Sequence, residues 1–185
     1  MKASTILLFL TLLCGFSMAQ AQEKKPKASP ADSAMVTTDD GVTISIKYSS
    51  PSLKGRKLGV DLAKVGEVWR TGANEATTVE FDKNVLVNGQ KLPAGKYSLY
   101  SIPGESQSTV IFNKTWKQWG TDYNEKDDAL RVQVDNEENG ENLERLKITA
   151  DKDGTIKVKW GDYGLPFLEL FPFIDTKKRF SKLAK

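Results

Sequence analysis

The sequence predicts an all-β fold: a single-domain antiparallel β-sandwich or open barrel with one or two short helices. Three observations support this prediction. Short segments alternate apolar and polar residues, which is typical of strands with one buried face. Asp-Gly and Asn-Gly pairs separate these segments and supply the positive backbone angles that tight hairpin turns need. Helical stretches are few, and many short strands between turn signals indicate a sandwich or barrel.

The alternation is clearest at residues 42–48, where Val42, Ile44, Ile46 and Tyr48 fall on one face. Similar segments on either side of turn signals predict four hairpins. Their strand pairs are 35–38 with 42–48, 77–81 with 85–87, 96–101 with 108–113, and 145–150 with 155–160.

Less regular segments predict the remaining elements. Short helices are expected near residues 60–65 and 141–143. Residues 164–173 are expected to form a last strand that contains Pro166 and Pro172, and strand prolines are typical of a sheet edge.

The N-terminus has the three parts of a secretory signal peptide. Lys2 precedes an apolar run at residues 6–16, and Ala19-Gln20-Ala21 gives a small-x-small ending. The run is shorter than the ~20 residues of a membrane helix, and no later segment is apolar enough to span a membrane. We therefore expect an exported protein, periplasmic or extracellular, after cleavage near Ala21.

The predicted organisation follows from these features. Residues 1–21 are the signal peptide, 22–33 a disordered leader, 34–174 the β-sandwich domain and 175–185 a basic C-terminal tail. The 164 residues that remain after cleavage suit one domain.

Composition excludes several functions. Cleavage removes one of 27 basic residues and none of the 24 acidic ones, and the resulting net charge of +2 argues against a nucleic-acid partner. The chain has no histidine, and its one cysteine, Cys14, lies in the signal peptide. These absences exclude a Ser-His-Asp triad and the usual zinc and copper sites. No cofactor or metal is implied.

The richest cluster of functional side chains lies around Gly72. An arginine there could bind an anion with its planar fork, aromatic rings could stack on a sugar, and amide and carboxylate groups could bond hydroxyls. The alternative is an internal ion pair between Arg70 and Glu75 that fixes the loop, with an indole in the core. The candidate ligand-binding residues are Tyr48, Arg56, Trp69, Arg70, Asn74 and Glu75.

Two further segments are candidates. Trp116 and Trp119, with lysines nearby, could form a stacking platform for a glycan; alternatively, one caps the core and the other covers a loop. Residues 135–141 imitate the start of a calcium loop, but its twelfth position is Leu146 where a bidentate acid is required, so an acidic turn is expected.

Residues 48–56, 68–77 and 92–104 carry three blocks that resemble one family, and Phe112-Asn113-Lys114 with Gln118-Trp119-Gly120 fits a fourth. The chain resembles domain of unknown function 2911, a family of secreted bacterial proteins, from about residue 34 to 170. Ser50 departs from the family pattern, in which we expect arginine. The resemblance implies a secreted, β-rich single domain and transfers no catalytic residue.

The sequence therefore predicts a non-catalytic binding protein for a small polar or carbohydrate-like ligand, or for an envelope protein. Two alternatives stay open. One is a glycan hydrolase that uses carboxylates, although no second acid stands out beside Glu75. The other is a structural interaction module of the envelope that binds through an exposed sheet edge.

Overall fold

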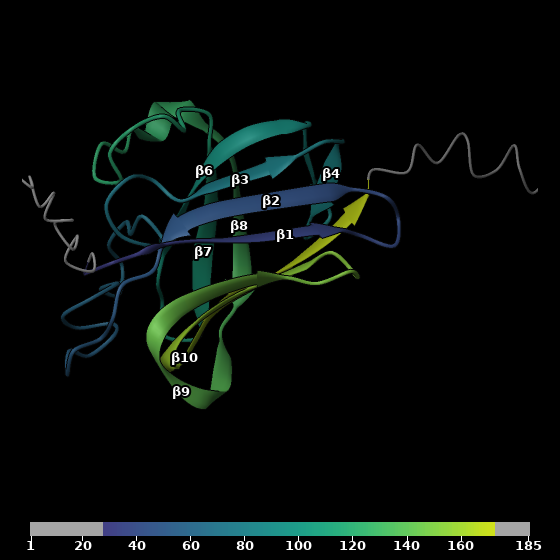
Figure 1. The fold of residues 1–185 in the computed structure, drawn as a ribbon. Coiled ribbons are helices and arrows are strands. Elements are labelled where there is room, and N and C mark those ends of the chain that lie inside the picture. Colours follow the sequence, from purple (N-terminus) through teal and green to yellow (C-terminus); the bar gives the residue numbers. More distant parts are fainter. Residues whose placement is uncertain (1–27, 173–185) are drawn as a thin grey trace, which may run out of the picture.

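The computed structural model describes residues 28–172, with residues 138–139 and 162–172 described by their backbone alone (Figure 1). The predicted signal peptide and basic tail lie outside the described residues. Two antiparallel sheets confirm the predicted all-β fold. The six-stranded sheet has the order β1-β2-β3-β6-β7-β8, and the four-stranded sheet has the order β5-β4-β10-β9.

The strands of the larger sheet are β1 Ala31–Thr37, β2 Thr43–Ser49, β3 Thr78–Phe81, β6 Gly95–Ile102, β7 Gln107–Asn113 and β8 Asp128–Asp135. Those of the smaller sheet are β4 Val85–Val87, β5 Gln90–Leu92, β9 Glu137–Ala150 and β10 Thr155–Pro172.

The main core fills the space between the two sheets. Alternate residues of β2, including Ile44, Ile46 and Tyr48, point inward, as the sequence pattern predicts. They meet Leu146 and Ile148 of β9 and the inward residues of β10. A smaller cluster of Ala76, Tyr100 and Ile111 lies apart from this core.

Three of the four predicted hairpins are confirmed: β1–β2, β6–β7 and β9–β10. The pairing of residues 77–81 with 85–87 is wrong, because β3 and β4 belong to different sheets. Residues 82–84 carry the chain across, and β4 pairs with β5 through the turn at Asn88-Gly89. The sequence correctly marks the end of one strand and the start of the next at residues 82–84, but this signal does not specify which strands pair.

The last strand does not lie at an edge, since β10 stands between β4 and β9. Its register explains how it accommodates proline. Pairing with β9 extends to Gly164, and pairing with β4 starts at Leu170, so Pro166 falls between the two paired segments. Pro172 is the final residue of the strand.

The two predicted helices are also wrong. Residues 60–65 form turns between Gly59 and Gly66, and Ala63 has a φ of 45°, which a right-handed helix cannot contain. Residues 141–143 lie in β9, where Leu143 pairs with Gly161. Within residues 28–172, the helical turn is η1, a 3-10 helix at Glu125–Asp127.

The long loops at residues 50–77 and 114–127 gather at one end of the sandwich, on the left in Figure 1. Backbone hydrogen bonds from Ala76 to Gln118 and from Gly120 to Asn74 join them. β1 enters at this end and begins at Ala31, three residues before the predicted domain start. Its pairing of Ala31 with Ser49 places residues 31–33 in the sheet.

Candidate functional site

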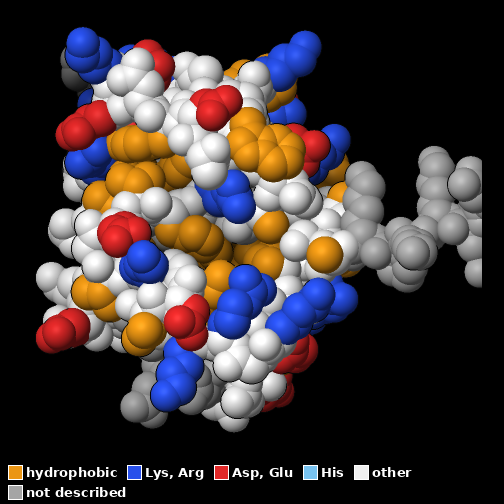
Figure 2. All heavy atoms as spheres, turned by 90° about the vertical axis from the view of Figure 1, so that its left-hand side faces the viewer, with side chains coloured by type: hydrophobic (Ala, Val, Ile, Leu, Met, Phe, Trp, Pro, Cys, Tyr) orange, Lys and Arg blue, Asp and Glu red, His pale blue; other side chains and the backbone are white. Residues whose placement is uncertain are grey.

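A groove of about 640 Å³ opens among these loops. Residues of the loops, the end of β6 and β10 line it, among them Arg56, Trp69, Arg70, Asn74 and Tyr100. Figure 2 looks onto this end of the molecule and shows hydrophobic side chains exposed among charged side chains of both signs. The lining of the groove combines apolar surface with three basic and two acidic side chains.

Two tryptophans form one wall of the groove. Trp69 is half-buried and stacks on Trp160, with ring centroids 5.7 Å apart and an interplanar angle of 17°. The backbone of Trp69 exchanges hydrogen bonds of 2.7 and 2.8 Å with Ser101 of β6. Trp160 is 1% exposed, and its indole N–H donates to the carbonyl of Glu144. Both rings are therefore fixed by the scaffold.

Two tyrosines form a second wall. The rings of Tyr100 and Tyr123 lie 4.8 Å apart, and both residues line the groove. Burial raises the pKa of Tyr100, and the positive charge of Arg70 acts in the opposite direction. Burial, followed by the hydrogen bond with Asp128, raises the pKa of Tyr123 to about 12. The Tyr123 hydroxyl donates to Asp128 and accepts from Arg131, and the Tyr100 hydroxyl accepts from Gln118, so both phenols are already bonded within the chain.

Arg70 follows Trp69 and lies on Gly120. A methyl group at Gly120 would stand 2.3 Å from Cδ of Arg70 and 2.8 Å from the carbonyl oxygen of Asn74. Only glycine leaves room for the arginine stem at this point. Among the described side chains, Arg70 makes no ion pair. The groove thus holds an arginine whose stem is positioned by Gly120 and whose charge has no ion-pair partner within residues 28–172.

The loop that carries Arg70 is fastened to the sheet by buried polar groups. Thr71 donates its hydroxyl to Ser101 Oγ, and Thr77 donates to the carbonyl of Thr71. Thr71 and Asn74 have φ values of 46° and 60°. A left-handed conformation is costly for a β-branched residue and persists only where the surroundings enforce it. The loop is therefore held in a defined shape.

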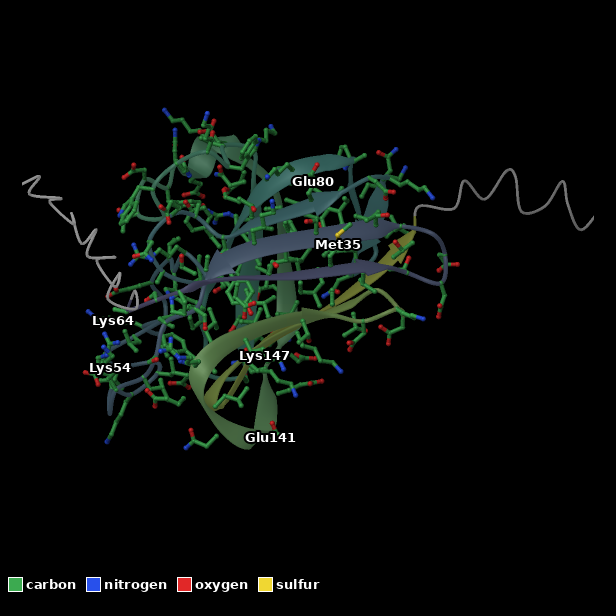
Figure 3. All side chains as sticks on the ribbon, viewed as in Figure 1. Met35, Lys54, Lys64, Glu80, Glu141 and Lys147 are labelled. Carbon is green, nitrogen blue, oxygen red and sulfur yellow. The ribbon has the colours of Figure 1, made fainter. Side chains whose placement is uncertain are left out.

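The other charged residues of the groove already have partners. Arg56 donates to the carbonyls of Leu53 and Ser52, which shapes its own loop. Lys64 and Glu67 lie 3.8 Å apart as an exposed ion pair, and Asp61 accepts from the backbone N–H of Lys57. Figure 3 labels Lys64 at the loop end of the molecule.

The structure distributes the predicted residues over more than one place. Arg56, Trp69, Arg70 and Asn74 line the groove, whereas Glu75 does not. Glu75 is exposed and forms no ion pair with Arg70, so the described side chains do not contain the proposed internal fastener.

Tyr48 lies in the main core, with its hydroxyl bonded to Asp32 and to the backbone N–H of Ile148. Trp116 and Trp119 are 40% and 48% exposed, so neither caps the core. Each lines a smaller hollow outside the groove.

Sequence reasoning missed Tyr100, Gly120, Tyr123 and Trp160. Tyr100 and Gly120 stand in blocks that carry the family resemblance, which was a usable signal. Tyr123 and Trp160 gave none, because only the tertiary fold brings them to Trp69 and Arg70. Residues 135–141 do not form a turn: β8 ends at Asp135 and β9 begins at Glu137.

Comparison with protein families identifies the class to which this fold and groove belong. Residues 29–168 match the model of a protein family of unknown function, DUF2911. The chain belongs to this family. Comparisons with curated proteins and with solved structures give no match.

In the part of the chain that the structure describes, no three His, Cys, Asp or Glu residues are placed to hold a metal ion. Within the same residues, no helix is long and apolar enough to cross a membrane.

Proposed function

We propose that this protein is exported and binds a small polar, carbohydrate-like ligand in the groove, with a negatively charged group of the ligand on Arg70. The proposal rests on the position of Arg70 in the groove and on the lack of an ion-pair partner for its charge among the described residues. Its stem rests on Gly120, its loop is fastened to β6, and its charge has no internal partner among the described residues. A guanidinium so placed is ready to form a bidentate contact with a carboxylate or sulfate.

The walls suit a sugar ring. Trp69 presents a fixed aromatic surface beside the arginine, and apolar faces of pyranose rings pack on such surfaces. Asn74 and Thr121 add polar groups to the lining of the groove. A pocket of this size with a few convergent polar groups is the usual form of a small-molecule site.

The groove also contains two carboxylates, Asp61 and Glu67. Asp61 is bonded to the backbone of Lys57, and Glu67 is paired with Lys64. A glycan hydrolase needs two acids that flank the scissile bond and are available to it. These existing contacts favour binding over hydrolysis, and release of reducing ends from any ligand that binds would contradict this preference.

A thermal-shift panel of neutral sugars, uronic acids and sugar sulfates tests the proposal. We expect uronic acids or sulfates to raise the melting temperature, because a ligand at a hundredfold excess over its Kd adds ~2.7 kcal/mol to the free energy of unfolding. Arg70→Gln should abolish the shift. Lys152→Gln removes one charge in the distant β9–β10 turn and should leave the shift intact.

Arg70→Lys sharpens the same experiment. Lysine keeps the charge but lacks the planar fork, so affinity for a carboxylated sugar should fall although the net charge is unchanged. A ligand that shifts the wild type and the Arg70→Gln variant equally would place binding elsewhere and overturn the proposal. A panel with no shift at all would also count against it and favour a protein partner.

A further inference from the structure

Two hollows lie beside the groove. The Trp119 hollow, of about 550 Å³, is lined by Ala28, Ser29, Ala31, Ser49, Asn74, Glu75 and Trp119. The Trp116 hollow, of about 300 Å³, is lined mainly by the ends of β1 and β2, residues 75–78 and residues 116–118. Each contains one of the two exposed indoles of the chain segment 116–119.

The three cavities follow one another in space around one loop. Ser29 and Asn74 line both the groove and the Trp119 hollow. Ala31, Ser49 and Glu75 line both the Trp119 hollow and the Trp116 hollow. The loop at residues 70–78 therefore borders all three, and together they form a track that runs from Arg70 past Trp119 to Trp116.

The backbone along this track is fixed. Ala76 N–H donates to the carbonyl of Gln118 at 3.1 Å, and Gly120 N–H donates to that of Asn74 at 3.0 Å. Glu75 and Trp119 form an antiparallel bridge between these bonds. Trp119 thus stands on a paired segment, which holds its backbone relative to the groove, and Trp116 lies two residues before this segment.

Both indoles are exposed although tryptophan is mostly buried in folded proteins. Trp116 is covered at one point by the ammonium of Lys96, 4.4 Å from the ring centroid, and Lys96 also pairs with Glu80 at 3.8 Å. These contacts order the Trp116 ring while 40% of the residue stays exposed. Exposed aromatic rings at separate points along a track suit successive rings of a chain of sugars.

The track is also positively charged. Six basic and three acidic side chains line the three cavities. Lys47 and Lys117 in the Trp116 hollow make no ion pair among the described residues, as is the case for Arg70 in the groove. Unpaired cations at both ends of the track favour a ligand that carries negative charge along its length.

We propose that the ligand is an acidic oligosaccharide that occupies all three cavities, with one acidic group on Arg70 and further sugar rings on Trp119 and Trp116. This inference rests on the proposed function, because it takes the Arg70 groove as one end of the binding site. A single sugar in the groove would reach neither of the two indoles and neither Lys47 nor Lys117.

Calorimetric titration with galacturonate chains of one, two, four and six units tests this proposal. We expect the Kd of the hexamer to be at least about tenfold lower than that of the dimer, because additional sugars reach the two indoles. Trp116→Ala and Trp119→Ala should each weaken hexamer binding by about tenfold and leave dimer binding unchanged. Met35→Ala removes an exposed apolar side chain that lines none of the three cavities and should change neither affinity (Figure 3).

The outcomes separate the two proposals. A dimer that binds through Arg70, with a hexamer that binds no tighter, would overturn the track and leave the proposed function standing. Equal affinity for maltohexaose, a neutral chain of the same length, would overturn the acidic class of ligand. Absence of binding by galacturonate chains of every length would overturn the track, and absence of any ligand at Arg70 would overturn both proposals.

Discussion

Tyr48 and Arg70 are both large polar residues that the sequence assigned to one site, and the structure uses them in opposite ways. The Tyr48 hydroxyl donates to Asp32 at 2.8 Å and accepts from the N–H of Ile148 at 3.1 Å, which ties β1 and β9 to β2. Arg70 is half-buried at the groove with no ion pair among the described residues. A polar group whose bonds are all made within the chain maintains the fold, whereas one with unused capacity is available to a ligand.

The largest effect on stability is expected at Trp160, whose side chain belongs to the main core and also lines the groove. Trp160→Ala should lower the free energy of unfolding by ~3–5 kcal/mol, because it leaves a cavity beside Trp69 and removes a buried ring. Urea denaturation measures the change. Trp119→Ala is the matched control and should stay within ~0.5 kcal/mol, since that indole is half exposed. Equal losses of stability in both variants would contradict the assignment of Trp160 to the core and of Trp119 to the surface.

Tyr48→Phe tests the residue whose hydrogen bonds are made within the chain. It removes both hydrogen bonds and leaves the buried N–H of Ile148 without its partner, so the free energy of unfolding should fall by ~1–3 kcal/mol. Binding of a uronic acid to the Arg70 groove should be unchanged in the same variant. A loss of binding with unchanged stability would reverse the roles given to Tyr48 and Arg70.

Alkaline pH should destabilise the fold through the tyrosines. Burial, chiefly, raises the pKa of Tyr48 to about 12, and burial with Asp128 raises the pKa of Tyr123 to about 12. A phenol with a raised folded pKa contributes its full stability below the unfolded pKa of ~10 and loses it as the pH rises towards 12.

Urea midpoints measured between pH 8 and pH 11 report this loss. Wild type should weaken above pH ~10, and the double variant Tyr48→Phe, Tyr123→Phe should show a smaller decline over the same range. An identical decline in both proteins would assign the effect to other groups.

The smallest effect on stability is expected at Arg70 itself. Arg70→Gln breaks no ion pair among the described residues, so the free energy of unfolding should change by no more than ~0.5 kcal/mol, although ligand binding is lost. Urea denaturation and the thermal-shift assay, run side by side, measure both properties. A loss of ~3–5 kcal/mol, as for a broken buried ion pair, would establish Arg70 as a structural fastener.

The local pattern predicted most of the strands but not their partners. Asp153-Gly154 and Asn88-Gly89 each mark a hairpin, because both glycines take positive φ values that tight turns require. Residues 82–84, Asp-Lys-Asn, also separate two strand-like segments but contain no glycine, and they carry the chain from one sheet to the other. The helices predicted at 60–65 and 141–143 failed for similar reasons: strand pairing and left-handed residues override a weak helical preference.

The site was predictable where sequence neighbours stay together. Trp69, Arg70 and Asn74 remain close because one short loop carries them. Tyr48 lies in the core, as the alternation of residues 42–48 indicates, and it also lines the Trp116 hollow. The sequence left two alternatives for Trp116 and Trp119, an exposed platform or burial over the core and a loop, and their exposure of 40% and 48% agrees with the first.

The first described residues of the chain form part of the groove. The carbonyl of Ser29 accepts from the amide of Asn74 at 3.4 Å, and the carbonyl of Pro30 accepts from the N–H of Ser50 at 2.8 Å. Ser29 also lines both the groove and the Trp119 hollow. An affinity tag or fusion partner joined directly before Ala28 would therefore be tethered at the mouth of the site. Recombinant protein made for binding assays should carry a spacer or removable tag at this end, because an attached domain could itself mimic or block a ligand.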